Sequence, residues 1–231
     1  MFFSAVTEAW HGKLYEEHYL PANLCQSRLD GRNGSNACTV IATQVATKVL
    51  QGLLPLPDPG EALQQKSVDS FVACIREGNR LYDSHPKCHG YLSCYKVISL
   101  WPEELRIVKE HRFTSKTHCR ASLREIVEEL QGSNEGALEV GILTKSPFTI
   151  CVVIRAGRIT LFDSHDHYAV HSYGCLGALV AVPHLAADAA DGGFYVSEFF
   201  YRCLQSPFHQ ADFTIVELKE KADCAIKGES I

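Results

Sequence analysis

Cys38 has the sequence surroundings of a reactive thiol. It follows a turn dipeptide, Asn33-Gly34, and two possible helix caps, Ser35 and Asn36, whose side chains can accept the free N–H groups of a first helical turn. The partial positive charge at that end of a helix stabilises a thiolate and lowers the pKa of the thiol. A small cysteine that only packs in a core would fit the same place. Cys38 by itself therefore leaves both interpretations open.

Three residues that alternate along the chain, Asp163, His165 and His167, share one face of a predicted strand end. A carboxylate beside an imidazole can accept its N–H and fix its tautomer, which leaves the other ring nitrogen to activate a thiol. Asp163 and His165 would then act as orienter and base for Cys38. His167 lies four residues from Asp163, roughly 13 Å along an extended strand at ~3.3 Å per residue, so we expect no bond between them. A strand end with solvated polar side chains is the alternative.

Gln26 lies twelve positions before Cys38 on a predicted loop. Thiol proteases stabilise the oxyanion of the tetrahedral intermediate with backbone N–H groups and often with a side-chain amide. Gln26 is the best placed amide for this role, with Asn23 and Asn36 as weaker candidates. A solvated loop glutamine is the non-catalytic alternative.

A metal site is the main chemical alternative to a thiol site. Asp163, His165 and His167 could supply three ligands on one face, and the segment His85–Cys94 is rich in histidine and cysteine. That segment lacks the paired Cys-x-x-Cys spacing typical of structural zinc. The glycine-rich motifs that bind phosphates are absent from the sequence. We therefore expect neither a metal nor a cofactor.

The composition is that of an ordinary globular protein. The chain has 231 residues, of which 46% are hydrophobic and 21% charged, enough for one sizeable core. We expect a single domain over residues 1–231, with its core at about 20–218 and a frayed polar tail at 219–231. The net charge of −5 and the absence of a basic stripe argue against nucleic acid as a partner.

The cysteine count suggests where the protein works. Ten cysteines could form a disulfide framework, but the N-terminus lacks the pattern of a secretory signal. We therefore expect free thiols in a reducing compartment, the cytoplasm or nucleus. The most apolar stretch, Gly174 to Ala187, contains Pro183 and His184 and is too short to span a bilayer.

The elements that must position these residues change type near the middle of the chain. Apolar residues recur at helical spacing in the first half, and β-rich runs follow in the second. Residues 1–33 carry two mixed segments, 2–19 and a loop at 21–33, and residues 95–101 and 103–111 fit either a helix or a strand. Helices are predicted over 36–53, 61–81, 117–132 and 194–204, and strands over 137–144, 148–155, 158–162, 178–182 and 213–218.

Helices followed by an antiparallel sheet make an α+β pattern. A nucleophile on the leading helix would face groups carried by the sheet, which is how papain-like hydrolases are built. We therefore expect a papain-like α+β fold, with a helical N-terminal part packed on a mainly antiparallel sheet.

Three motifs follow one another along the chain: Gln26, the helix start Gly-Ser-Asn-Ala-Cys38-Thr and the run Phe162-Asp163-Ser164-His165. In these motifs and their order the chain resembles the tegument-type deubiquitinases. These are papain-fold cysteine proteases related to the herpesviral large tegument protein, and their acidic residue precedes the histidine by two. The resemblance covers about residues 20–218, with the middle unmatched. It implies Cys38 as nucleophile, His165 as base, Asp163 as orienter and Gln26 as oxyanion donor.

The same resemblance implies a substrate, which is ubiquitin or a ubiquitin-like modifier cleaved after its C-terminal Gly-Gly. Two other deubiquitinase classes match less well. Ovarian-tumour proteases have Asp-Gly-Asn-Cys at the nucleophile, and in ubiquitin-specific proteases the histidine precedes the third triad member. Another papain-like thiol peptidase or acyltransferase, or a non-catalytic binding module of the same fold, remains the alternative.

Overall fold

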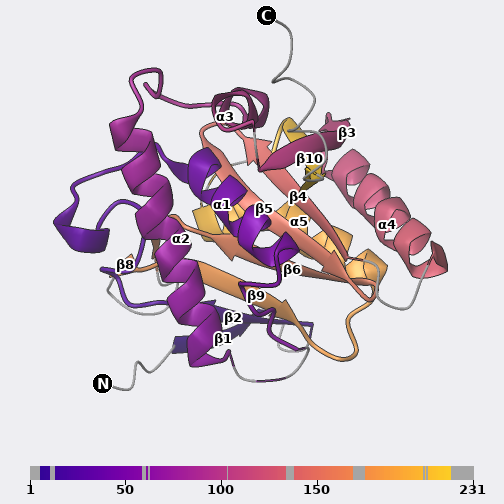
Figure 1. The fold of residues 1–231 in the computed structure, drawn as a ribbon. Helices are drawn as coiled ribbons and strands as arrows, with labels where there is room; N and C mark the ends of the chain where they lie inside the picture. The colour runs from indigo at the N-terminus through magenta and orange to yellow at the C-terminus, as the bar shows by residue number, and fades with distance from the viewer. Residues whose placement is uncertain are drawn as a thin grey trace, which may run out of the picture.

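An eight-stranded antiparallel sheet forms the centre of the described chain (Figure 1). The computed structural model describes residues 6–10, 14–58, 61, 63–102, 104–133, 138–168, 175–204, 206 and 208–219. Across the sheet the strands follow the order β1-β2-β9-β6-β5-β4-β10-β3. Their bounds are β1 Val6–Trp10, β2 Tyr15–Tyr19, β3 Leu105–Phe113, β4 Leu138–Lys145, β5 Phe148–Arg155, β6 Arg158–Asp163, β9 Leu179–Pro183 and β10 Ala211–Leu218.

Helices cover both faces of this sheet. Two further short strands, β7 (His167–Tyr168) and β8 (Cys175–Leu176), pair with each other beside it. Figure 1 shows α1 and α2 in front of the sheet and α5 behind it. The helices are α1 Cys38–Leu50, α2 Gln65–Ser84, α3 Cys94–Leu100, α4 Lys116–Ser133 and α5 Ala189–Leu204, with a short 3-10 turn at Leu29–Gly31.

Each face of the sheet has its own hydrophobic core. On one face α1 and α2 pack on alternate residues of the central strands, with Ile41 and Phe71 against Val153 and Phe162. The other alternate residues of the same strands, such as Val152 and Leu161, pack against α4 and α5. This alternation is the period-2 pattern of a sheet covered on both sides.

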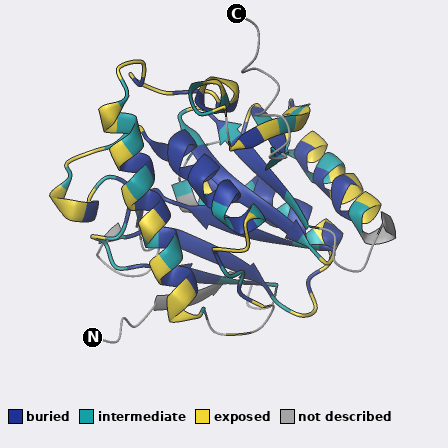
Figure 2. Ribbon diagram, in the orientation of Figure 1, coloured by how far each residue is buried: buried dark blue, intermediate teal, exposed yellow. Residues whose placement is uncertain are grey.

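Helix α1, which carries the predicted site residue Cys38, is almost entirely buried. Eleven of its thirteen residues are buried, because the sheet lies on one side and α2 and α3 lie on the other. Figure 2 shows α1 almost entirely in the buried colour, whereas α2 alternates between buried and exposed residues. The start of α1 is therefore held by packing all around it, which fixes the position of any side chain placed there.

The predicted elements agree with the structure in type, with shifted ends. The helix predicted over 36–53 begins at Cys38, and the one predicted over 61–81 is α2. The ambiguous residues 95–101 belong to helix α3, and residues 103–111 overlap strand β3. Strand β3 lies at the edge of the sheet, and the charged residues in its exposed middle hid its strand pattern.

The N-terminal region contains two strands that the sequence pattern did not identify. Both β1 and β2 lie in the mixed segment 2–19, and Tyr15 and Tyr19 of β2 are buried in the core against α5. The buried Glu17 between them interrupts the apolar alternation that would have marked the strand. The predicted tail beyond residue 219 lies outside the described residues. None of the described helices is both long and apolar enough to cross a membrane.

Candidate active site

Cys38 is the first residue of α1, but the side-chain cap predicted for this helix is absent. The N-cap residue is Ala37, which makes no side-chain hydrogen bond. Because the helix begins later than predicted, Ser35 lies outside the capping position; its Oγ accepts the backbone N–H of Ala37 (3.1 Å) and donates to Oδ1 of Asn79 on α2 (2.7 Å). Asn36 is exposed. The first N–H groups of α1 are thus left without a side-chain cap next to the Cys38 thiol.

Asp163 and His165 form the pair that their spacing predicts. Asp163 is the last residue of β6, and the chain bends directly after it. Its Oδ1 lies 2.5 Å from Nδ1 of His165 and also accepts the backbone N–H of His165 at 3.0 Å. The ring of Phe148 packs edge-on against the imidazole, with 5.0 Å between centroids. With Nδ1 bound to the carboxylate, Nε2 of His165 is left for the thiol.

The Cys38 thiol and the His165 imidazole are electrostatically coupled. Burial raises the pKa of Cys38, but its hydrogen bond and charge interaction with His165, together with hydrogen bonds from Thr149 and Thr39, bring that pKa below its ordinary value. Burial lowers the pKa of His165, but the charge and hydrogen bond of Asp163, followed by those of Cys38, bring it above its ordinary value. These opposite shifts favour a thiolate–imidazolium pair.

Cys38 differs in this respect from the other cysteines that the structure describes. All seven of these are free thiols. Burial raises the pKa of six of them, to about 12 for Cys74, Cys94 and Cys119. Of the described thiols, Cys38 is thus the one set up to react as a thiolate.

His167 lies much closer to Asp163 than its separation in the sequence predicts. Its Nε2 is 3.3 Å from Oδ2 of Asp163, so the expectation of a separation near 13 Å was wrong. That estimate assumed an extended chain from residue 163 to residue 167, whereas the strand ends at Asp163 and the chain bends at His165. The bend brings both imidazoles to one carboxylate.

Gln26 connects the nucleophile segment to the base segment. Its Oε1 accepts the hydroxyl of Ser164 (2.8 Å), and its Nε2 donates to the carbonyl of Ser35 (3.3 Å). Its backbone N–H donates to the carbonyl of Ser164 (2.8 Å), and its backbone carbonyl accepts Nδ2 of Asn79 (3.0 Å). Gln26 is buried, whereas the weaker candidates Asn23 and Asn36 are exposed. The side chain lies between the two halves of the site, with its amide orientation fixed by Ser164.

A groove lies beside Cys38, on the side of the β4–β5 turn. The thiol lies 3.6 Å from the carbonyl of Pro147 in that turn. A cavity of about 200 Å³ begins here and is lined by Thr39, Tyr91, Pro147 and Thr149 among others. Its wall residues Ser93 and Thr144 also line a second cavity of about 360 Å³.

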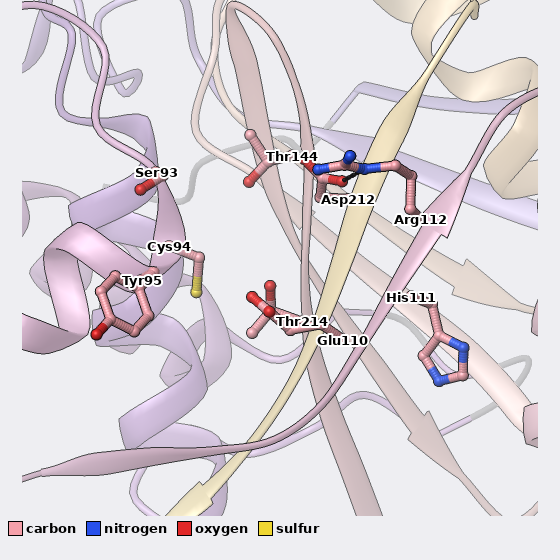
Figure 3. Close-up of a pocket in the computed structure, with 9 residues that line it drawn as sticks. All are labelled: Ser93, Cys94, Tyr95, Glu110, His111, Arg112, Thr144, Asp212 and Thr214. Atoms are coloured by element: carbon pink, nitrogen blue, oxygen red, sulfur yellow. Dashed lines mark hydrogen bonds and ion pairs between the residues drawn. The ribbon is translucent and has the colours of Figure 1, made fainter.

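The second cavity lies between α3 and the strands β4, β10 and β3 (Figure 3). Figure 3 shows Tyr95 on the helix side and the ion pair between Arg112 and Asp212 on the strand side, at 2.9 Å. Tyr91 and Tyr95 are 64% and 70% exposed, so aromatic rings stand open along the groove. The first of the two cavities reaches Pro147 and Thr149, which lie beside the thiol.

The described residues contain no group of three or more His, Cys, Asp or Glu side chains placed to hold a metal ion. The two oxygens of Asp163 instead face the two imidazoles.

No protein-family model and no curated protein matches this sequence. A solved structure is similar in fold: the ubiquitin-specific protease encoded by murine cytomegalovirus tegument protein M48, in complex with a ubiquitin-based suicide substrate. The two chains are 17% identical and superpose with a TM-score of 0.52 over 91% of this chain and 88% of that one. The likeness is one of fold. The α+β class predicted from the sequence, with helices packed on an antiparallel sheet, is thereby confirmed.

Several residues of the site were not found from the sequence. Ser164 lies between the predicted residues Asp163 and His165, but its position in the sequence gave little indication of a role. Its hydroxyl points away from that pair and donates to Gln26. Asn79 and Thr149 come from α2 and β5, and only the folded chain brings them to the site.

Proposed function

We propose that this protein is a cysteine-dependent deubiquitinase that hydrolyses the isopeptide bond after the C-terminal Gly-Gly of ubiquitin or a ubiquitin-like modifier. The observation that carries the proposal is the contact of Cys38 with His165, which lowers the pKa of this thiol while burial raises the pKa of the other described thiols. The similarity of the fold to a viral ubiquitin-specific protease supports the substrate class.

The proposed reaction begins with the thiolate of Cys38. It attacks the carbonyl carbon of the terminal glycine and forms a tetrahedral intermediate with a negative oxygen. Nε2 of Gln26 and the uncapped N–H of Cys38 stabilise that oxygen. The imidazolium of His165 protonates the leaving lysine amine, and a thioester remains on Cys38.

The second half of the reaction restores the enzyme. His165, now neutral, takes a proton from a water molecule that attacks the thioester, and the modifier leaves with a free carboxylate. Asp163 stabilises the imidazolium in both halves and keeps the proton on Nδ1. Tetrahedral collapse returns Cys38 as a thiolate paired with His165.

The groove beside Cys38 supports a substrate with an extended, narrow end. Its walls at Thr39, Thr149 and Pro147 come close to the thiol, so glycine residues without side chains would reach Cys38 most easily. The order of Gln26, Cys38, Asp163 and His165 supports assignment to the tegument-type deubiquitinases. The seven free thiols support a reducing compartment as the place of action.

A ubiquitin-based suicide probe tests the proposal directly. We expect a covalent adduct on Cys38, lost in Cys38→Ala and retained in Cys151→Ala. Probes built on ubiquitin-like modifiers, used in parallel, identify the preferred modifier. Labelling by small electrophiles but by no modifier probe would instead indicate another thiol peptidase or acyltransferase. A Cys38 without raised reactivity would indicate a binding module.

A further inference from the structure

The two oxygens of Asp163 have different partners. Oδ1 accepts Nδ1–H and the backbone N–H of His165 at 2.5 Å and 3.0 Å. Oδ2 lies 3.3 Å from Nε2 of His167, within ion-pair distance, and no described residue makes a hydrogen bond of regular geometry to Oδ2. The Asp163 side chain is 0% exposed, so bulk water does not supply a donor in its place. His167 therefore lies on the side of the carboxylate that His165 leaves open.

The ring of His167 is itself fixed by packing. It is buried and meets the rings of Tyr19 and Phe199 edge-on, at 5.5 Å and 6.3 Å between centroids. The hydroxyl of Tyr19 donates to Oε2 of the buried Glu17 (2.7 Å). Because β2 and α5 both contribute to this wall, the imidazole has little freedom to turn away from Asp163.

We propose that His167 is a positioning residue of the catalytic site, whose Nε2–H fixes the second oxygen of Asp163 and keeps the carboxylate turned towards His165. The inference rests on the roles proposed above for Cys38, His165 and Asp163. The terminal torsion of an aspartate is broad and soft. A hydrogen bond on one oxygen leaves the carboxylate free to rotate about it, and a second contact from the opposite side removes that freedom.

Loss of the Nε2–H donor of His167 should weaken the contacts that link Asp163 to His165 and His165 to Cys38. A buried carboxylate oxygen without a partner makes the ionised form of Asp163 less favourable. The imidazolium of His165 would then be less well stabilised, and the thiolate of Cys38 with it. The reacting atoms keep their places, so the effect should fall on kcat and leave KM unchanged.

Two variants of similar size separate the donor from the packing. His167→Leu fills the space without a donor, and His167→Gln carries an N–H at a similar reach. For cleavage of a ubiquitin–fluorophore conjugate we expect His167→Leu to lose about tenfold in kcat at unchanged KM, with most of the loss restored in His167→Gln. Wild-type kcat in His167→Leu, or equal loss in both variants, would overturn the proposal.

The pH profile of Cys38 alkylation gives a second readout that a merely structural role would not move. In His167→Leu the weaker ion pair should shift the acid limb of the profile to higher pH, and His167→Gln should bring it back. This measurement needs no ubiquitin, so it still tests His167 if the protein cleaves another substrate. An unshifted limb in a folded His167→Leu contradicts the proposal. Besides Cys38 on α1, further ionisable side chains surround Asp163, His165 and His167. They include Glu17 and Tyr19 on β2 and Tyr195 and Arg202 on α5.

The wild-type protein provides a test that does not depend on the variants folding. Long-range ¹H–¹⁵N correlation spectra of protein labelled at histidine report which ring nitrogen carries the proton. Contacts to the ring protons of Tyr19 and Phe199 assign His167. We expect the proton on Nε2 of His167, facing Asp163. A neutral ring protonated on Nδ1, with a bare Nε2, would overturn the inference whatever the substrate.

Discussion

Cys38 and a group of three core cysteines are all buried close to α1, but their thiol pKa values are shifted in opposite directions. Cys74, Cys94 and Cys151 belong to the hydrophobic core under α1 and α2, and burial raises the pKa of each. Cys38, at the start of α1, has a lowered pKa, although its exposed fraction of 3% equals that of Cys74. Equal burial with opposite shifts means that exposure alone does not set the thiol pKa here. The imidazole within reach of Cys38 does.

The same comparison explains why the site lies where it does. At the core cysteines burial outweighs every favourable contact, including Lys48 near Cys74 and Thr214 beside Cys94, so ionisation of any of them is disfavoured. Cys38 lies where α1 meets the bend after β6, and the charge that it acquires is balanced by His165.

The largest effect should come from deleting one thiol from each group. Cys38→Ala should abolish turnover of a ubiquitin substrate, because no other described thiol combines a lowered pKa with a base. Cys151→Ala should keep turnover, since Cys151 contributes packing alone. Steady-state assays of both purified variants, with folding checked by circular dichroism, make the measurement. Activity in Cys38→Ala would remove this thiol from the mechanism.

Asp163→Asn should lower kcat by about 10⁴-fold while leaving Cys38 in place. The amide can donate where the carboxylate accepts, which favours the wrong tautomer of His165, and it removes the charge that stabilises the imidazolium. The loss should appear both in turnover and in alkylation of Cys38 near neutral pH. A variant that cleaves substrate at the wild-type rate would show that Asp163 does not orient the base.

Gln26→Ala should lower kcat by about 10²-fold with little change in KM, as expected for a donor that acts on the transition state. Gln51→Ala, at an exposed position just after α1, is the matched control and should leave both constants unchanged. Since Gln26 also bridges Ser164 and Ser35, thermal unfolding must be measured on the same samples. Unchanged kcat in Gln26→Ala would exclude it as the oxyanion donor.

Iodoacetamide should label Cys38 at least ten times faster than Cys151 at neutral pH, since one pKa unit changes the thiolate fraction about tenfold. Because its pKa is lowered, Cys38 is partly ionised at pH values below the ordinary pKa of a thiol. Because its pKa is raised, Cys151 ionises only at higher pH. Peptide mass spectrometry on folded protein gives both rates. Equal rates would mean that His165 does not activate Cys38.

Those parts of the site that depend on local geometry could be predicted from the sequence. Cys38 is fixed by a helix start, and Asp163 with His165 by a spacing of two residues at a strand end. The error over His167 has a local cause as well: a strand was assumed to continue where it bends. Because the strand ends at Asp163 and does not continue to residue 167, the second imidazole comes close to the carboxylate.

Contacts between distant segments could not be predicted, because no local pattern encodes them. Ser164 and Gln26 are 138 positions apart, and the partners of Glu17 on α5, Tyr195 and Arg202, lie 178 and 185 positions after it. Glu17 was misleading by itself, since a glutamate argues against a buried strand unless its partners are known. Strand β2 and the wall behind His167 were missed for this reason.

The smallest expected effect is on stability, and it separates the two cysteine groups without any substrate. Serine in place of Cys151 would bury a hydroxyl among apolar side chains and the neighbouring thiols, which should cost about 1 kcal/mol of unfolding free energy. Serine in place of Cys38 would meet His165, Thr149 and the carbonyl of Pro147, so its hydroxyl keeps hydrogen-bond partners and stability should hardly change. Urea unfolding of the two variants beside wild type measures the difference. A Cys38→Ser variant as destabilised as Cys151→Ser would mean that the start of α1 is as apolar as the core beneath it, and the contrast between the two groups would fail.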